Sequence, residues 1–287
     1  MIRDFREKHK NVILVDAGDF FWQRRLGELR AKITARALRM MRYDALNVSD
    51  GELSYGIDFL QGFAPKLKGA FVSSNVTGQE DLPWKPYIIK ELKGLKVAVL
   101  GIISHDLVNH VRMREDGILV EDQEACLKRL LPDLRKKADL VVLLSHLGWK
   151  QTRALLEKVP GIDIAIVGHA YYPTFDSEKI GQTILLKNSI GGKHLGIVKL
   201  WLDSSKKIKT IKSSLKELSS DIHVYSEYTL PETEFETKKG GLNRRKKQVQ
   251  KKEQMMEKFK DWTKLSPEEF VKKMNQEKGK GFIRDKK

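Results

Sequence analysis

Four short apolar runs in the sequence each end in a side chain that can bind a metal ion. The runs VILVDAGD, ALNVSD, VVLLSH and AIVGH end at Asp19, Asp50, His146 and His169. In α/β sheets, ligands gather at the carboxyl ends of strands, where the connecting loops converge. Two carboxylates and two imidazoles suit a borderline divalent cation such as Zn²⁺, Mn²⁺, Fe²⁺ or Co²⁺. The pattern therefore predicts one metal site built from these four side chains.

Each of the four residues also has an ordinary structural interpretation. An aspartate after a strand often caps the following helix. A single histidine after a strand is more often a hydrogen-bonded loop residue than a metal ligand. The repetition of the pattern at four strand ends is what favours a shared site.

The elements that must position these residues alternate between strand and helix patterns. Apolar residues recur at helical spacing between Leu26 and Met41 and again between Leu127 and Leu134. Strands are predicted at Val12–Val15, Ala45–Val48, Phe71–Ser73, Val97–Ile103, Leu140–Leu144, Ile162–Val167, Thr183–Leu186 and Leu195–Leu202. Strands that alternate with helices predict an α/β layered fold.

Length and composition are compatible with such a fold. The chain has 287 residues, of which 40% are hydrophobic, enough for one large α/β core. No apolar run approaches the roughly 20 residues that cross a bilayer. The single cysteine, Cys126, excludes an internal disulfide. The first residues, MIRDFREKHK, do not resemble a signal peptide. They indicate the end of an amphipathic helix, so we expect a domain that is incomplete at its N-terminus.

Most of the excess positive charge lies near the C-terminus. The net charge is +16, and residues 238–287 hold 18 lysines and arginines against 7 acidic residues. We expect a folded domain over residues 1–220, a linker over 221–240 and a basic helical tail over 241–287 with a disordered end. The tail could bind nucleic acid or an anionic membrane surface. A solvated helical arm is the simpler interpretation, because the tail lacks the interleaved aromatic residues typical of RNA binding.

Several motifs resemble those of the calcineurin-like metallophosphoesterases. They are DAGD, YDALNVSDGELSYGIDFL, LLSHLG, IDIAIVGHAYYP and ILLKNSIGGKHLGIVKLWLD, and they follow in order between Val12 and Asp203. The branch that they resemble is the N-terminal domain of the 5'-nucleotidase / UDP-sugar hydrolase family. The resemblance implies a four-layer α-β-β-α sandwich and a two-metal site that activates water to attack phosphorus.

Matched position by position, the resemblance assigns metal-binding roles to the same strand ends. Asp19 stands at the carboxylate that bridges two metals in the family, and Asp50 stands where the family has an asparagine ligand. His146 matches the histidine of the fourth motif, and His169 matches the first histidine of Gly-His-x-His.

The chain also departs from the family pattern. The opening Asp-x-His motif is absent from this chain, and Tyr171 stands at the second histidine of Gly-His-x-His. Gly51 stands where the family has a histidine thought to protonate the leaving group, and losing such an acid typically costs about 10²–10⁴-fold in rate. The resemblance therefore implies one divalent metal per chain, one of Mn, Zn, Fe or Co, and weak hydrolysis.

Three further residues are predicted to contact substrate. Tyr171 could line the pocket or donate to a bound anion. His194 in GGKHLG lies near the family's substrate side, although an ordinary polar role is equally open. Asn75 in SSNV resembles a family motif near a strand end, and a turn role is as well supported.

The function that these features favour is metal-dependent hydrolysis of a phosphate-ester small molecule, which could be a nucleotide. The rival is a catalytically inactive metallophosphoesterase fold that serves as a binding or scaffold module. Nucleotide specificity stays open, because the basic tail stands where full-length 5'-nucleotidases have the domain that recognises nucleosides. Exported relatives suggest the periplasm, but no residue pattern here assigns a compartment.

Overall fold

The computed structural model describes residues 1–21, 27–68, 70–78, 81–107, 116–169, 177–187 and 192–218, together with Glu269. The chain divides into two units, Met1–Val224 and Tyr225–Lys287, and all described residues except Glu269 belong to the first. Apart from Glu269, the expected linker and basic tail therefore lie outside the described residues. Within the described part of the chain, no helix is long and apolar enough to cross a membrane.

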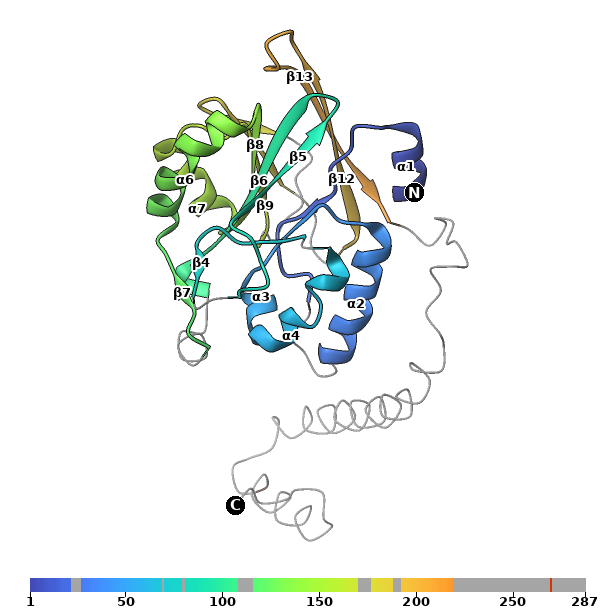
Figure 1. Ribbon diagram of the computed structural model, residues 1–287, viewed down its shortest axis with the longest axis vertical. Coiled ribbons are helices and arrows are strands. Elements are labelled where there is room, and N and C mark those ends of the chain that lie inside the picture. The colour runs from blue at the N-terminus through green and yellow to red at the C-terminus, as the bar shows by residue number, and fades with distance from the viewer. Residues whose placement is uncertain are drawn as a thin grey trace. The chain divides into compact units, whose positions relative to one another are not determined.

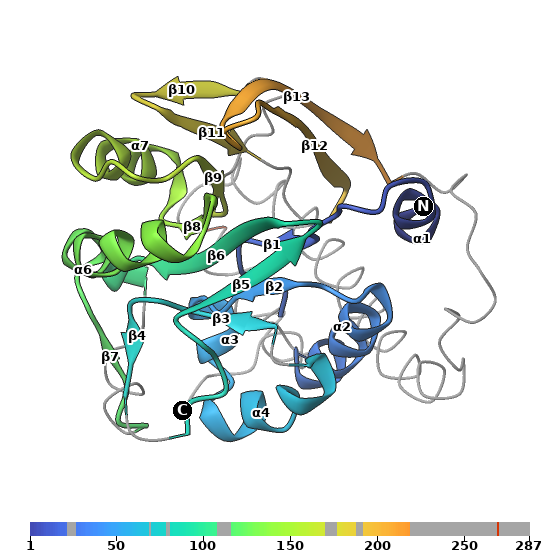
Figure 2. The same cartoon turned by 45° about the horizontal axis from the view of Figure 1, so that its top comes forward.

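The larger sheet has six strands in the order β10-β11-β9-β8-β6-β5. Figure 1 labels β5, β6, β8 and β9, and Figure 2 also labels β10 and β11. Their bounds are Tyr87–Leu92 (β5), Leu95–Ile103 (β6), Leu140–His146 (β8), Ile164–Val167 (β9), Glu178–Ile180 (β10) and Thr183–Lys187 (β11). The four inner strands run parallel, and β5 and β10 pair antiparallel at the two edges. The strands predicted on the long apolar runs are confirmed by β6, β8, β9 and β11.

The smaller sheet has three short parallel strands, β1 (Val15–Asp16), β2 (Ala45–Asn47) and β3 (Phe71–Val72). The strand predicted to begin at Val12 begins only at Val15. The reason is local: the backbone N–H of Leu14 donates to the Asp44 carboxylate at 2.8 Å instead of to a neighbouring strand. Two antiparallel pairs complete the strands, β4 (Val76–Thr77) with β7 (Leu119–Val120) and β12 (His194–Leu202) with β13 (Ile208–Glu217).

Helices α2 (Gly27–Met41), α3 (Asp50–Leu53), α4 (Ile57–Gln61), α6 (Gln123–Lys137) and α7 (Gly148–Lys158) cover the outer faces of the two sheets. Helix α1 (Ile2–Lys8) buries no residue, and short 3-10 turns lie at Pro65–Leu67 and His105–Leu107. The two predicted helical patterns are confirmed by α2 and α6. Figure 2 shows α6 and α7 beside the large sheet and α2, α3 and α4 on the side of the small sheet.

Three apolar clusters hold these elements together. One lies between the large sheet and helices α6 and α7, one between the small sheet and helices α2 to α4, and one between the two sheets. Because side chains alternate along a strand, Val141 and Leu143 face the helices whereas Leu140 and Leu144 face the small sheet. His146 continues the second series, so the last residue of β8 points toward the small sheet. The result is a mixed α/β fold.

Candidate metal centre

Side chains from both sheets converge at the carboxyl ends of the strands. Ligand atoms of Asp19, His146 and His169 all lie within 4.8 Å of one another. The Nε2 atom of His146 lies 3.3 Å from Oδ2 of Asp19 and 3.5 Å from Oδ1 of Asp50. The rings of His146 and His169 have centroids 5.2 Å apart. The structure thus brings the four predicted ligands together around one histidine.

The surroundings of His146 are compatible with metal binding. Its side chain is 1% exposed. Its Nδ1 atom lies 2.9 Å from the carbonyl oxygen of Ala17, so Nδ1–H donates there and, in the neutral ring, the lone pair lies on Nε2. Nε2 is buried and makes no hydrogen bond with the described residues. Metal-binding histidines typically donate their second nitrogen to a carbonyl or carboxylate in this way, so the residues fit a bound cation.

The charges of this cluster are mutually dependent. Burial alone would lower the pKa of His146, but the adjacent Asp19 carboxylate outweighs it and raises the pKa to about 8. Burial works to raise the pKa of Asp19, whereas the His146 ring and Ser49 bring it below its ordinary value. Burial and the Asp19 charge raise the pKa of Asp50. Without a metal, an imidazolium can therefore balance the carboxylates, and a metal must displace its proton to bind.

Two of the candidate ligands have unusual backbone conformations. Asp19 has φ of 61° and His169 has φ of 52°, in the left-handed region that costs non-glycine residues about 1 kcal/mol or more. The glycines that precede them make room for the His146 ring. A Cβ atom at Gly18 would lie 2.9 Å from His146 Nδ1, and one at Gly168 would lie 2.8 Å from it. The two loops can therefore close on the imidazole only with glycine at these positions.

Glu52 anchors the Asp19 loop, a role that the sequence reasoning missed. Its buried carboxylate accepts hydrogen bonds from the backbone N–H groups of Asp19 (3.1 Å), Phe21 (2.8 Å) and Ser49 (3.1 Å) and from the Ser49 hydroxyl (2.7 Å). Burial raises the pKa of Glu52 to about 7 although the bonds from Ser49 and Phe21 oppose that shift. The spacing Ser49-x-x-Glu52 is a capping-box pattern and could have revealed the residue.

Asn47 and Asp16 also support the site, and neither was predicted. The Asn47 amide donates to the carbonyl oxygens of Ala17 (3.3 Å) and Ile102 (3.0 Å), which joins the small sheet to the large one beside His146. Asp16 accepts from the Gly18 N–H at 2.9 Å, and burial raises its pKa to about 6. Nothing in the local sequence distinguishes Asn47 from an ordinary strand residue.

Gly51 lies against the Asp19 carboxylate. A Cβ atom at position 51 would lie 2.4 Å from Asp19 Oδ1 and 3.3 Å from the carbonyl oxygen of Phe21. A histidine here would therefore require the Asp19 carboxylate to turn away. Gly51 itself supplies no proton, as the sequence indicated.

The three predicted substrate contacts have different surroundings. Asn75 is buried, and its amide donates to the carbonyl oxygens of Ile103 and Glu121 and accepts from the Ile103 N–H. It therefore braces the loop after β3 against β6. His194 is the first residue of β12, opposite Glu217, and is not part of the three-residue ligand group. Tyr171 lies outside the described residues.

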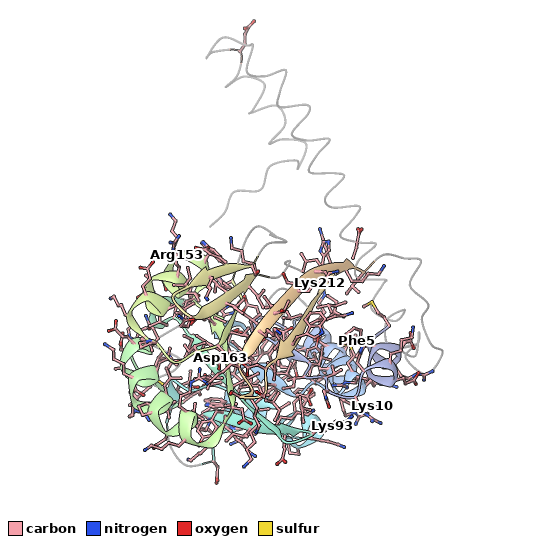
Figure 3. The ribbon with its side chains drawn as sticks, turned by 90° about the horizontal axis from the view of Figure 1, so that it is seen from above. Phe5, Lys10, Lys93, Arg153, Asp163 and Lys212 are labelled. Atoms are coloured by element: carbon pink, nitrogen blue, oxygen red, sulfur yellow. The ribbon has the colours of Figure 1, made fainter. Side chains whose placement is uncertain are left out.

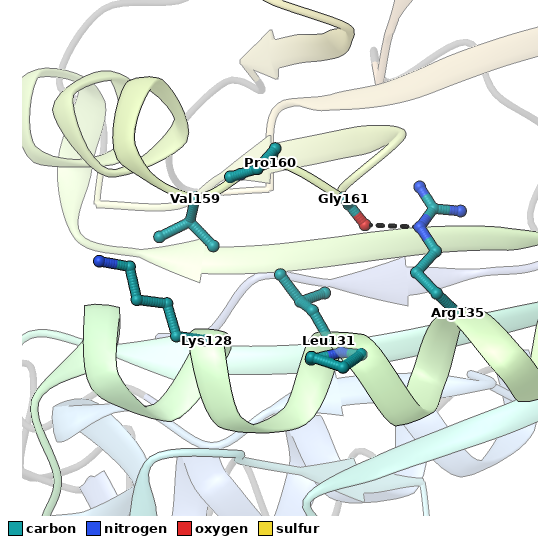
Figure 4. A pocket seen from close by; sticks show the side chains of 7 residues that line it. Lys128, Leu131, Arg135, Val159, Pro160 and Gly161 are labelled. Atoms are coloured by element: carbon teal, nitrogen blue, oxygen red, sulfur yellow. Dashed lines mark hydrogen bonds between the residues drawn. The ribbon is translucent and has the colours of Figure 1, made fainter.

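A surface cavity of about 290 Å³ lies away from this centre. It is lined by Lys128, Leu131, Pro132, Arg135, Val159, Pro160 and Gly161 (Figure 4). These residues belong to α6 and to the segment before β9, at the amino ends of the strands rather than the carboxyl ends. The Arg135 Nε atom donates to the Gly161 carbonyl oxygen at 2.8 Å, and the guanidinium pairs with Asp163. The cavity is thus a packing feature between helix and loop.

The chain has distant sequence relatives among known phosphoesterases. No family model matches the chain. The 2',3'-cyclic-nucleotide 2'-phosphodiesterase/3'-nucleotidase of Salmonella typhimurium is 26% identical over 248 residues, which cover 71% of this chain and 38% of that enzyme. The chain therefore spans little more than a third of this relative's length.

Solved structures show the same fold. The sulfate thiohydrolase SoxB of Thermus thermophilus matches with a TM-score of 0.69 and 24% identity, covering 79% of this chain and 43% of that one. The calcineurin-like phosphoesterase YfkN of Bacillus subtilis matches with a TM-score of 0.65 and 23% identity, covering 79% and 83%. The sequence similarity makes the chain a distant homologue of calcineurin-like metallophosphoesterases of the 5'-nucleotidase and 2',3'-cyclic phosphodiesterase type, and the solved structures show that it shares their fold.

Proposed function

We propose that the chain binds one divalent transition metal through Asp19, Asp50, His146 and His169 and hydrolyses phosphate esters slowly. One observation carries the proposal: the buried Nε2 atom of His146 faces two carboxylates while Nδ1 is held by the Ala17 carbonyl. Relatives that act on nucleotides support a nucleotide-like ester as the substrate class.

The protein's own groups have distinct parts in this chemistry. When bound, the metal supplies Lewis-acid activation of water and neutralises phosphate charge. The Ala17 carbonyl fixes the tautomer and orientation of His146, and Glu52 holds the backbone of Asp19. No side chain extends from Gly51 to protonate the leaving group. A missing general acid of this kind costs about 10²–10⁴-fold in rate, which is the reason for expecting slow turnover.

The finer architecture is part of the same proposal. The three apolar clusters support a four-layer α-β-β-α sandwich over residues 1–220. A linker over 221–240 and a basic tail over 241–287 complete the proposed organisation. Removing the residues after Gly240 should leave the melting temperature nearly unchanged. A large drop would show that the tail packs on the domain.

Metal content tests the proposed centre. Elemental analysis of the purified chain should find about one Mn, Zn, Fe or Co per molecule, and His146→Ala should lose it. A matched control is His105→Ala, which removes an exposed histidine from the turn that follows β6, the strand paired with β8. This variant should still bind the metal. Two tightly held metals per chain would contradict the one-metal proposal.

Measuring the rate of hydrolysis distinguishes a slow hydrolase from an inactive binding module. The glycine at position 51 is compatible with both. With the metal bound, hydrolysis of an aryl phosphate should be slow but should disappear in His146→Ala. Metal binding without any turnover above the buffer rate would support the binding module. Rapid hydrolysis of nucleotides would show that a residue other than position 51 donates the proton.

A further inference from the structure

The two-stranded ribbon formed by β12 and β13 has two different faces. Leu200, Leu202 and Ile208 pack against the cluster between the sheets. The opposite face, here called the outer face, alternates with them. Its residues are Leu195, Ile197, Lys199 and Trp201 on β12 and, registered opposite them, Lys216, Ser214, Lys212 and Thr210 on β13.

The outer face is basic and carries no acidic residue. Lys199 and Lys212 stand directly opposite each other, and both are exposed, as is Lys216. Figure 3 labels Lys212 on this ribbon. Lys206 in the hairpin turn pairs with Asp139, but the three outer-face lysines form no ion pair with any described residue. Like charges directly opposite on paired strands are destabilising, so a bound anion would relieve this repulsion.

An exposed aromatic ring lies among these lysines. Trp201 is 50% exposed and stands two residues from Lys199 on the same face. Large aromatic side chains usually lie mostly inside a soluble protein. On proteins that bind single-stranded nucleic acid, exposed aromatic rings stack against bases while neighbouring lysines and arginines follow the phosphates.

We propose that the outer face of the β12–β13 ribbon binds single-stranded nucleic acid. Lys199, Lys212 and Lys216 contact phosphates, and Trp201 stacks against a base. Antiparallel strands rise about 3.4 Å per residue, so Lys212 and Lys216 are about 14 Å apart along β13. Basic positions spread along a strand suit a chain of phosphates better than one phosphate group. The proposal does not depend on turnover at the metal centre.

The test measures binding of the full chain to a fluorescently labelled 20-residue oligothymidylate by anisotropy. Trp201→Ala should weaken binding by about 5- to 150-fold, the range expected when one stacked base loses its aromatic partner, and Trp201→Phe should recover most of it. Lys199→Glu should weaken binding and reduce the slope of log K against log salt concentration by about 0.7 for each phosphate that is no longer neutralised.

The melting temperature of Lys199→Glu shows whether this variant is folded. Glutamate at position 199 would face Lys212 and replace a repulsive pair with an attractive one, so the melting temperature should hold or rise while binding falls. Lys128→Glu makes the same charge change at an exposed site on α6 and should bind nearly as the original chain does. Equal binding by Lys199→Glu, Trp201→Ala and Lys128→Glu would overturn the proposal. So would tighter binding to phosphatidylserine vesicles or to duplex DNA than to the oligothymidylate.

Discussion

The two sheets of this protein satisfy their backbones in different ways. Strands of the large sheet reach nine residues and form regular ladders, so their buried side chains are nearly all apolar. Strands of the small sheet have two or three residues, and polar side chains take over where the ladder ends. Asp44 binds Leu14 N–H, Asn47 joins the two sheets, and Glu52 binds three backbone N–H groups.

The candidate metal ligands are divided between these two sheets. His146 ends a long buried strand of the large sheet, where its position is fixed by packing. Asp19 and Asp50 come from the small-sheet side, where the backbone is irregular and held by side chains. We infer that the large sheet provides the rigid support and that the polar network of the small sheet sets the positions of the carboxylates. Four experiments test this division of roles between the two sheets.

The largest effect is expected at Glu52. Glu52→Ala removes an acceptor from three backbone N–H groups and one hydroxyl. The Asp19 N–H keeps the Ser49 hydroxyl as a partner, and each buried donor left without one costs about 1–3 kcal/mol. We expect a loss of about 4 kcal/mol in the free energy of unfolding, measured in urea, together with weaker metal binding. Glu157→Ala, at an exposed position, should change stability by less than about 0.5 kcal/mol. If Glu52→Ala were equally mild, the network would not hold the small sheet together.

A large-sheet substitution should separate stability from metal binding. Leu143 is fully buried between β8 and the helices. Leu143→Ala should cost about 3 kcal/mol through reduced burial and the remaining cavity. Because the regular ladder still holds His146, metal affinity per folded molecule should stay the same in isothermal titration. A parallel loss of metal affinity would argue against a rigid large-sheet support.

The contact at Gly51 predicts an effect on metal binding with little effect on folding. Gly51→Ala would place a Cβ atom against Asp19 Oδ1, so the carboxylate must rotate. An off-rotamer side chain costs about 0.5–1.5 kcal/mol, and about 1.4 kcal/mol corresponds to tenfold in affinity. Metal affinity should therefore fall by up to about tenfold. Unchanged affinity would mean that Asp19 binds the metal in a different rotamer.

The fourth experiment concerns the pH dependence of the metal-free protein. The pKa of Glu52 is raised to about 7 and that of His146 to about 8, so the folded state holds protons that the unfolded state releases earlier. Stability should then fall as pH rises from about 5 to 8. Metal binding displaces the His146 proton, so the increase in melting temperature caused by metal should grow over the same range. The melting temperature can be measured against pH in buffers of matched ionic strength, with and without metal. A melting temperature of the metal-free protein that rises between about pH 5 and 8 would contradict this assignment.

Several features of the fold could be read from the sequence because their cause is local. Long apolar runs such as Val97–Ile103 and Leu140–Leu144 can form only buried strands here, and the helical spacing over 26–41 has one apolar face. Polar residues that follow such runs must lie at the carboxyl ends of the strands. For that reason the candidate ligands could be named before their geometry was known, and their binding of metal stays a prediction.

Other features depend on contacts between segments that are far apart in the chain, so no local sequence pattern could reveal them. The left-handed turn at Asp19 is held by Glu52, 33 residues away. His146 is oriented by the carbonyl of Ala17, 129 residues away. The side of the β12–β13 ribbon that faces solvent follows from its packing on the cluster between the sheets. A local pattern specifies which residues are buried or polar, but the partner of a buried donor or the exposed face of a ribbon is fixed only when distant segments pack together.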